Sequence, residues 1–79
     1  MNNQDIKNAP KLAWNNHNLL KDNCGCYHCL EIINVQDIKE WTDYGKTAIC
    51  PKCNCDCLIP EIDLNNLKKI QDYWIKKPN

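Results

Sequence analysis

Cysteines are the residues of this chain most able to do chemistry. Seven of them occur in 79 residues, all within two short stretches, CGCYHC and CPKCNCDC. Each stretch contains a Cys-x-x-Cys turn, which we call a knuckle; such a turn points two sulfurs at one spot while backbone NH groups face them. Twenty residues separate the two knuckles, Cys26 with Cys29 and Cys50 with Cys53. This spacing is typical of a four-cysteine zinc site.

The sequence therefore predicts one structural Zn²⁺ ion, held by Cys26, Cys29, Cys50 and Cys53. Three alternatives are weaker. A redox-active Cys-x-x-Cys needs an extended βαβ sheet behind it, and the chain is too short for that. An iron–sulfur cluster would fit four cysteines, but the spacing and the β-prone surroundings favour zinc. A disulfide framework would leave one of the seven cysteines unpaired.

Cys24, Cys55 and Cys57 remain to be explained. Cys24 is an alternative ligand to Cys26, because the CGC turn lets both thiols approach the same spot. If the segment after Cys53 is extended, side chains alternate, and Cys53, Cys55 and Cys57 share one face. Cys55 would then support the metal site from beside the ligands, and Cys57 would be a small buried apolar residue. A second zinc ion held by Cys24, Cys55, Cys57 and a histidine is a further alternative.

Candidate catalytic residues are scarce. Catalytic zinc sites usually keep one coordination position open, whereas four thiolates close the shell. His17 lies in an Asn-rich segment and is expected to be solvated. His28 lies inside the first knuckle and is expected to be exposed or to support the site without binding the ion. No Ser/His/Asp order and no phosphate-binding glycine loop occurs. We expect no enzyme activity.

Three features taken together, CGCYHC, IKEWTDYGKTAICPKC and the Asp56 that follows, resemble a group of small bacterial and phage-associated zinc-ribbon proteins, mostly uncharacterised cytoplasmic proteins. Members carry CGCxxC and TAxCPxC knuckles, and the resemblance spans residues 24–59. It implies the same four cysteine ligands and implies no activity. The chain departs from the group at Cys55, at Cys57 and at Asn54, where glycine is usual. Because asparagine tolerates the left-handed conformation, the turn should survive.

The predicted fold class is a small α+β domain stapled by zinc. Residues 1–23 form an N-terminal arm, loosely ordered or with a short helix from Pro10 to Lys21, and Trp14 is expected to pack on the domain or on a partner. Residues 24–79 form a zinc-ribbon-like domain, with a short helix between the knuckles and an amphipathic C-terminal helix. At this size an apolar core alone leaves a fold marginal, so a metal staple is expected.

The helix between the knuckles is predicted over residues 34–44. Asn34 can cap its N-terminus, and Gly45 can supply the left-handed residue after its last turn. Apolar residues recur every three positions along one face: Val35, Ile38 and Trp41.

The C-terminal helix is predicted to begin at Asp63. Apolar residues follow at spacings of three, three and four: Leu64, Leu67, Ile70 and Trp74. Before this helix, the segments KTAIC and LIPEI flank the second knuckle and predict a β-hairpin, whose ladder stops at Pro60.

Composition indicates which partners and which cellular compartment to expect. Ten lysines balance ten acidic residues, and there is no arginine. Because arginine supplies the bidentate guanine contact and DNA-binding proteins normally carry a basic excess, direct nucleic-acid binding is disfavoured. The N-terminus has no apolar run of signal-peptide length, and no segment approaches the roughly 18 apolar residues of a membrane helix. We expect a cytoplasmic protein whose reduced thiols are available to metal, with no membrane contact.

We expect the chain to act as a binding module for a protein partner. Tyr73, Trp74 and Ile75 are consecutive large residues on a helix, so they cannot all face one core stripe. Exposed aromatic residues make good interface anchors, and Trp14 joins these three in the predicted partner surface. The partner could be a host defence nuclease or nucleoprotein complex, inhibited on behalf of a phage or mobile element, or a second copy of this chain.

The alternative function is that of a nucleic-acid-binding zinc ribbon. Tyr27 and His28 in the first knuckle would then touch a backbone or a base, together with nearby lysines. The candidate lysines lie in loops and in the last helix: Lys46, Lys52, Lys68, Lys69, Lys76 and Lys77. A solvated helix face is the simpler explanation of these lysines.

Overall fold

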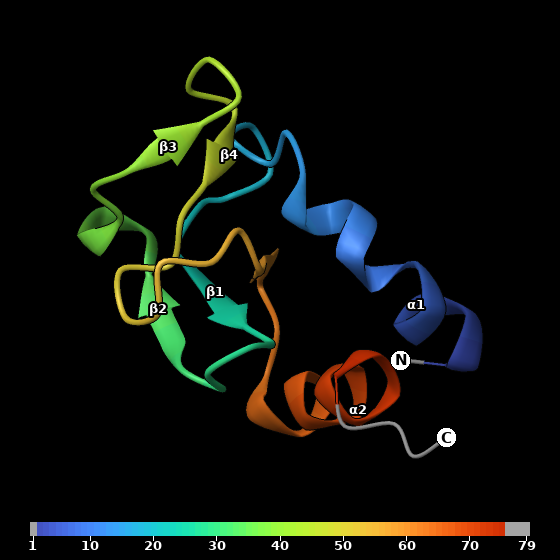
Figure 1. Ribbon diagram of the computed structural model, residues 1–79. Helices are drawn as coiled ribbons and strands as arrows, with labels where there is room; N and C mark the ends of the chain where they lie inside the picture. Colours follow the sequence, from blue (N-terminus) through green and yellow to red (C-terminus); the bar gives the residue numbers. More distant parts are fainter. Residues whose placement is uncertain (1, 76–79) are drawn as a thin grey trace.

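Two small antiparallel sheets, an N-terminal arm and a C-terminal helix make up the protein in a computed structural model, which describes residues 2–75 (Figure 1). The arm contains helix α1 (Asn3–Asn8) and the 3₁₀ turn η1 (Ala9–Ala13), and the C-terminal helix is α2 (Leu64–Trp74). The elements between them are β1 (Asn23–Cys26), β2 (Ile32–Asn34), the 3₁₀ turn η2 (Val35–Asp37), β3 (Trp41–Thr42), β4 (Thr47–Ala48) and β5 (Leu58–Pro60). The predicted α+β class is confirmed.

The three-stranded sheet has the order β2-β1-β5, so β1 is its central strand. Both pairings are antiparallel, and Cys24 lies opposite Ile33 of β2 and opposite Pro60 of β5. Neighbouring residues of a strand point to opposite faces of a sheet. Cys24 and Cys26 accordingly enter one buried cluster, while Gly25 between them faces α2.

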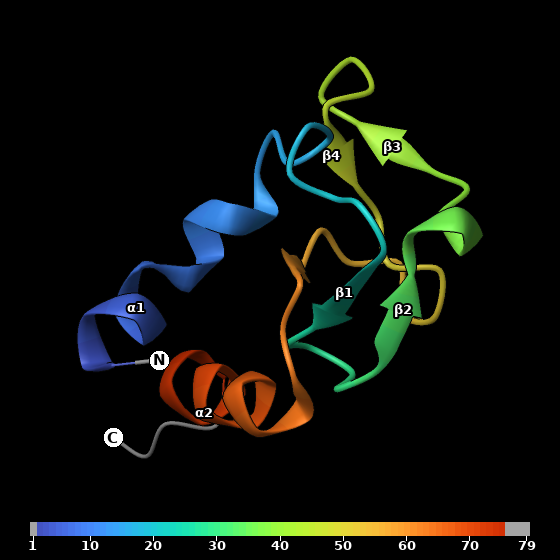
Figure 2. The ribbon, with the colours of Figure 1, turned by 180° about the vertical axis from the view of Figure 1, so that it is seen from behind.

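Buried side chains form two clusters, one on each face of this sheet. The first, which we call the cysteine cluster, consists of Leu20, Cys24, Cys26, Ile33, Ile38, Ala48, Cys50 and Leu58. The second, the helix cluster, joins the arm and α2 to the other face and consists of Ile6, Ala9, Ala13, Ile59, Ile62, Leu67 and Ile70. Figure 2 shows α1 and α2 side by side, at the end of the molecule away from β3 and β4.

Gly25 is required by the close approach of α2 to β1. A Cβ atom at this position would lie 2.7 Å from Ile62 Cγ2 and 2.9 Å from Leu67 Cγ. Carbon atoms in contact normally stay about 3.5 Å or more apart. Both faces of β1 therefore explain its CGC sequence. The two cysteines direct their sulfurs into the cysteine cluster, and the glycine between them has no side chain to obstruct α2.

Helix α2 forms as the sequence predicts. The Asp63 carboxylate caps it by accepting a hydrogen bond from the Asn66 NH at 2.8 Å. Leu67 and Ile70 in the middle of the predicted apolar stripe are fully buried. Neither α2 nor any other helix within residues 2–75 has the length and apolarity to cross a membrane.

The arm is helical at a different place from the one predicted. α1 begins with a capping box, in which Asn2 and Asp5 exchange hydrogen bonds between side chain and backbone NH. The helix predicted from Pro10 to Lys21 is wrong, because the chain makes the five-residue turn η1 and then continues irregularly. Three side chains at the start of the arm are buried: Ile6, Ala9 and Ala13. Because two of them are alanines with small side chains, they give only a weak hydrophobic pattern in the sequence.

A buried asparagine that the sequence analysis missed ties the arm to both sheets. The Asn16 amide nitrogen donates to the Leu58 carbonyl of β5 at 2.9 Å, and its side-chain oxygen accepts from the Ala48 NH of β4 at 3.1 Å. Since β4 and β5 belong to different sheets, one fully buried side chain joins them. The backbone NH groups of Asn15 and His17 also donate to the β3–β4 hairpin.

The helix predicted over residues 34–44 is wrong. Asn34 does cap a turn, since its side chain accepts from the Gln36 NH at 3.1 Å, but that turn is the three-residue η2, and β3 follows it. Apolar residues every three positions suit a 3₁₀ turn, with three residues per turn, as well as they suit a helix. Pairing with the segment that follows in the β3–β4 hairpin then satisfies the backbone, as when the Ile49 NH donates to the Glu40 carbonyl at 3.0 Å.

The strands around the second knuckle pair differently from the prediction. The expected hairpin from KTAIC to LIPEI is wrong, because β4 pairs with β3 while β5 pairs with β1. Gly45 is left-handed as predicted, with a φ of 83°, but it lies in the β3–β4 loop beside Asp43 and Tyr44, whose φ values of 53° and 60° are also positive. β5 ends at Pro60, as the sequence predicts.

Gly25→Ala is expected to lower the free energy of unfolding by about 1–3 kcal/mol, the usual cost of overpacking a dense core. The added methyl group would collide with Ile62 and Leu67. Denaturant unfolding of protein purified without chelator measures the effect. Asn23→Ala, at an exposed position of the same strand, is the matched control and should stay within about 0.5 kcal/mol of the wild type. Equal stabilities of the two variants would contradict the explanation.

Asn16→Ala is expected to destabilise the protein by about 2–4 kcal/mol, because the Ala48 NH and the Leu58 carbonyl would both lose their buried partner. Asn18→Ala is the control, since Asn18 is exposed and its side chain bonds only to the adjacent His17 ring within the described chain. Denaturant unfolding compares the two. A loss for Asn16→Ala no larger than that for Asn18→Ala would show that the buried amide does not join the sheets energetically.

Candidate metal centre

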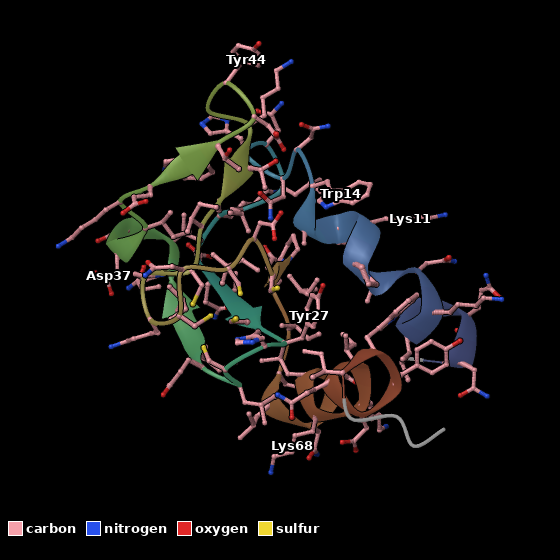
Figure 3. The ribbon with its side chains drawn as sticks, viewed as in Figure 1. Lys11, Trp14, Tyr27, Asp37, Tyr44 and Lys68 are labelled. Atoms are coloured by element: carbon pink, nitrogen blue, oxygen red, sulfur yellow. The ribbon has the colours of Figure 1, made fainter. Side chains whose placement is uncertain are left out.

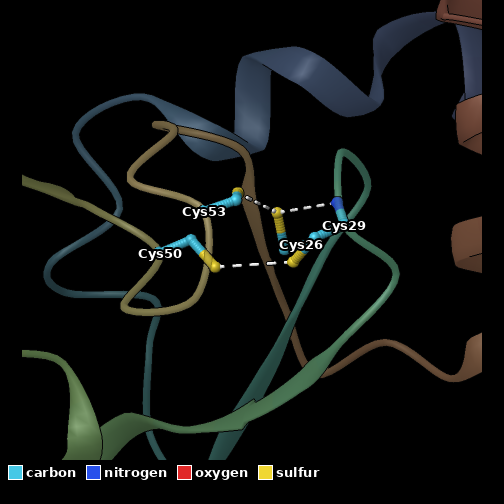
Figure 4. Close-up of side chains that lie close together, drawn as sticks. All are labelled: Cys26, Cys29, Cys50 and Cys53. Carbon is cyan, nitrogen blue, oxygen red and sulfur yellow. Dashed lines mark hydrogen bonds between the residues drawn. The ribbon is translucent and has the colours of Figure 1, made fainter.

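Four sulfur atoms from the two knuckles lie together (Figure 4). The Sγ atoms of Cys26, Cys29, Cys50 and Cys53 are all within 4.8 Å of one another. Between knuckles, the Cys26 and Cys53 sulfurs are 3.5 Å apart and the Cys29 and Cys50 sulfurs are 3.7 Å apart. A tetrahedron with metal–sulfur bonds of about 2.3 Å has edges of about 3.8 Å. The arrangement therefore fits a four-coordinate metal ion with thiolate ligands.

Each knuckle is closed by the same pair of backbone hydrogen bonds. Around the first knuckle, over residues 26–31, the Cys26 NH donates to the Glu31 carbonyl at 3.0 Å, and the Leu30 NH donates to the Cys26 carbonyl at 2.8 Å. The second knuckle (residues 50–55) repeats both bonds at the same offsets, with distances of 2.8 and 2.9 Å. Two segments of different sequence thus present their sulfurs through one backbone geometry.

A left-handed residue completes each knuckle at the equivalent position. These residues are Leu30, with a φ of 59°, and Asn54, with a φ of 63°. Asn54 therefore takes the conformation expected of it in place of glycine. Leu30 has no such natural tolerance, and its side chain packs against the helix cluster, which holds it in place.

Backbone NH groups point at the sulfurs. The Cys29 NH donates to Cys26 Sγ at 3.5 Å, and the Lys52 NH donates to Cys50 Sγ at 3.4 Å. Cys29 and Cys53 each accept from the NH two residues further on. Hydrogen bonds of this kind stabilise the negative thiolate, which is the form that binds metal.

Burial sets the protonation of the four thiols. Desolvation raises the pKa of Cys29 to about 11 and also raises the pKa values of Cys26 and Cys53. Burial opposes ionisation of Cys50 as well, but the NH groups of Lys52 and Cys53 outweigh it, and the pKa of Cys50 lies below its usual value. A divalent ion must therefore displace protons from at least three thiols. Metal affinity should consequently fall as the pH falls.

The four-sulfur group has a buried side and a solvent side. Cys26 and Cys50, the first cysteine of each knuckle, are fully buried, whereas Cys29 and Cys53 are half-buried. His28, in the turn of the first knuckle, is exposed. Four protein ligands leave no position on the ion for a substrate, but the outer sulfurs remain close to solvent.

Cys24, the predicted alternative ligand, lies beside the four sulfurs but outside the group that they form. It is fully buried in β1, and its thiol donates to the Ile33 carbonyl of β2 at 3.6 Å. Burial, followed by the charge of nearby Cys50, raises the pKa of Cys24 to about 11. The structure thus places Cys24 as a hydrogen-bonded thiol of the core.

Cys55 does not lie on a strand, because residues 51–57 form turns and irregular chain. The alternation that would put Cys53, Cys55 and Cys57 on one face therefore does not apply. The Cys55 sulfur nevertheless lies within 4.8 Å of the ligand atoms of Cys53 and His28.

Cys57 is half-buried against the cysteine cluster and lies near the side chains of Tyr27 and Cys55. Desolvation is the main cause that raises its pKa to about 12, so it is a neutral thiol at physiological pH. Burial and then the neighbouring Cys57 raise the pKa of Tyr27 above its usual range. The Tyr27 ring is itself half-buried against the helix cluster.

Gln71 supports the site, and the sequence analysis did not identify it. It is buried on α2, and its amide nitrogen donates to the His28 carbonyl at 2.9 Å. This bond ties α2 to the turn of the first knuckle. The sequence did hold a signal for this residue: Gln71 is polar but lies four positions after Leu67, on the same helix face as the predicted apolar stripe.

The predicted partner residues lie on the arm and at the end of α2. Trp14 is 63% exposed, and Trp74 and Ile75 are each 46% exposed. Tyr73 is half-buried, and its ring meets that of Trp74 edge to face, with centroids 5.1 Å apart. Figure 3 shows Trp14 at the end of η1 away from α1, projecting outward near Lys11.

Comparison with known proteins does not extend the argument: no protein-family model, curated protein or solved structure matches the chain. The resemblance to the small zinc-ribbon group stays a prediction. Inferences about function rest on the geometry of the site and the exposed surface.

Protein purified without chelator is expected to retain about one tightly bound zinc ion per chain, as measured by elemental analysis. Cys50→Ser should lose the ion together with much of the fold, because a buried ligand of the four-sulfur group is removed. Cys24→Ser should keep the ion, because Cys24 lies outside that group. Loss of zinc from a folded Cys24→Ser variant would place Cys24 among the ligands and contradict the assignment.

Proposed function

We propose that the chain is a non-enzymatic, zinc-stapled module that acts by binding a protein partner. The four-sulfur group supplies the staple, and exposed apolar side chains of the arm and of α2 supply the contact surface. The observation that carries the proposal is Trp14, a large aromatic side chain left 63% exposed directly after η1 in the arm.

Zinc is the ion that best suits the four sulfurs. Thiolate ligands select soft or borderline ions, and four of them in a tetrahedron are typical of structural zinc. The sulfur separations of 3.5 and 3.7 Å support this assignment. Because four ligands close the coordination shell, the ion would stabilise the fold and take no part in a reaction.

The Trp14 side chain belongs to neither cluster of buried residues. Its backbone NH donates to the Lys11 carbonyl at 3.4 Å, but its indole forms no hydrogen bond within residues 2–75. Leu12 and Leu19 of the arm are exposed as well, and Leu12 lines a groove of about 600 Å³ beside the β5–α2 connection. Tryptophan is enriched among the few residues that carry most of the energy of an interface.

Trp74 differs from Trp14 because it also holds the fold together. Its indole NH donates to the Ile6 carbonyl of α1 at 2.9 Å. This bond fixes α1 on α2, so removing Trp74 would disturb the arm as well as the surface. Trp14 is therefore the better position at which to test partner binding.

A cytoplasmic inhibitor of a host defence nuclease is one member of the proposed class and stays a prediction. Nucleic-acid binding is the alternative function, and an experiment must distinguish it from binding of a protein partner. The packing of the half-buried Tyr27 ring against the helix cluster weighs against base stacking by that ring. Lys76 and Lys77 lie outside the described residues, and the net charge is zero.

Trp14→Ala is expected to weaken capture of the partner by about 10-fold or more, as loss of an interface anchor does. Tagged wild-type and variant chains would be incubated with extracts of the source cells, and captured proteins quantified by mass spectrometry. Tyr44→Ala is the matched control, because Tyr44 is 103% exposed at the tip of the β3–β4 loop, far along the molecule from α1.

Both substitutions should leave the stability within about 0.5 kcal/mol of the wild type, since both side chains are exposed. A partner captured equally by wild type and Trp14→Ala would argue against the arm surface. Tight binding to single- or double-stranded nucleic acid that falls steeply with salt would instead favour the alternative function.

A further inference from the structure

A second group of metal-binding side chains lies beside the four sulfurs. The ligand atoms of His28, Cys53 and Cys55 are all within 4.8 Å of one another. Cys53 also belongs to the four-sulfur group, so the two groups share one sulfur. The second ion considered from the sequence used Cys24 and Cys57, and neither belongs to this group.

The backbone of the two knuckles holds these ligands in position. The His28 carbonyl accepts a hydrogen bond from Gln71 at 2.9 Å. The Cys55 carbonyl accepts from the Cys50 NH at 2.8 Å, and the Cys55 NH donates to the Cys53 sulfur. Ligands whose backbone is already fixed lose less conformational freedom when they bind an ion.

The group is open to solvent and chemically suited to a thiophilic ion. His28 is exposed, and Cys53 and Cys55 are half-buried, in contrast to the fully buried Cys26 and Cys50. Thiolate and imidazole are the ligands that zinc and similar ions prefer. A thiolate sulfur has more than one lone pair, so Cys53 can bind two ions at once.

Charge favours a second cation at this place. A divalent ion with four thiolates carries a net negative charge, and a Cys55 thiolate would add to it. Asp56 follows directly in the sequence, and the chain contains no arginine that could neutralise the cluster. A second divalent ion would reduce the repulsion among these groups.

We propose that His28, Cys53 and Cys55 bind a second thiophilic metal ion, zinc or cadmium, with the Cys53 thiolate bridging the two ions. This proposal rests on the four-cysteine centre proposed above. Three protein ligands leave one position to solvent, so the second ion binds more weakly than the first. Metal binds a cysteine as its thiolate, so any proton on the Cys55 sulfur leaves to solvent when the ion binds.

Cadmium titration of the full chain, followed by thiolate–metal absorption and by cadmium NMR, tests the proposal. The wild type is expected to take up two ions per chain and to show two resonances with a scalar coupling through the Cys53 sulfur. His28→Ala and Cys55→Ser should each take up one ion and lose the second resonance. His17→Ala is the matched control and should take up two, because the exposed His17 ring lies against Trp41, outside the group.

A wild type that saturates at one ion overturns the second site. Uptake of two ions by His28→Ala or Cys55→Ser overturns it as well. A chain that takes up no ion overturns the four-cysteine centre too, so the two failures are distinguishable. Should either variant fail to fold, the coupling between the two wild-type resonances still decides whether one sulfur bridges both ions.

Discussion

The meeting of four sulfur atoms from two distant knuckles is the constraint on which the rest of the structure depends. Residues 26–31 lead from the central strand β1 to β2, and residues 50–55 lie between β4 and β5. Bringing the sulfurs within 4.8 Å of one another therefore fixes the relative position of both sheets. In a chain this short, with two small clusters of buried side chains, a metal ion held by these four sulfurs would supply stability that apolar contacts alone would not.

The central strand shows how one short sequence serves two structural needs. On one face of β1, Cys24 and Cys26 enter the cysteine cluster, and on the other, Gly25 lets α2 approach. Helix α2 returns to the site through Gln71, whose bond to the His28 carbonyl steadies the first knuckle. The surface proposed for a partner and the proposed metal centre are thus parts of one connected scaffold.

Much of the candidate site was predictable, because knuckle spacing depends on residues close together in sequence. The four sulfurs that the spacing grouped do lie together, and Asn54 is left-handed as expected. The group of His28, Cys53 and Cys55 was not predicted, because the position of Cys55 depends on the irregular course of the chain after Cys53. Extended-strand alternation, which suggested a common face for the last cysteines, failed because turns replace the strand there.

The sequence by itself determined the local features: the two knuckles, the cap at Asp63, the helix that follows it and the left-handed residues Gly45 and Asn54. Each depends on hydrogen bonds and contacts that span only a few positions. Only the tertiary structure decided the course of residues 34–44, the partners of β4 and β5 and the role of Asn16. For β5 and Asn16 the decisive hydrogen bonds join residues far apart in the chain. For residues 34–44 the local pattern was compatible with more than one backbone, and the pairing of β3 with β4 decided between them.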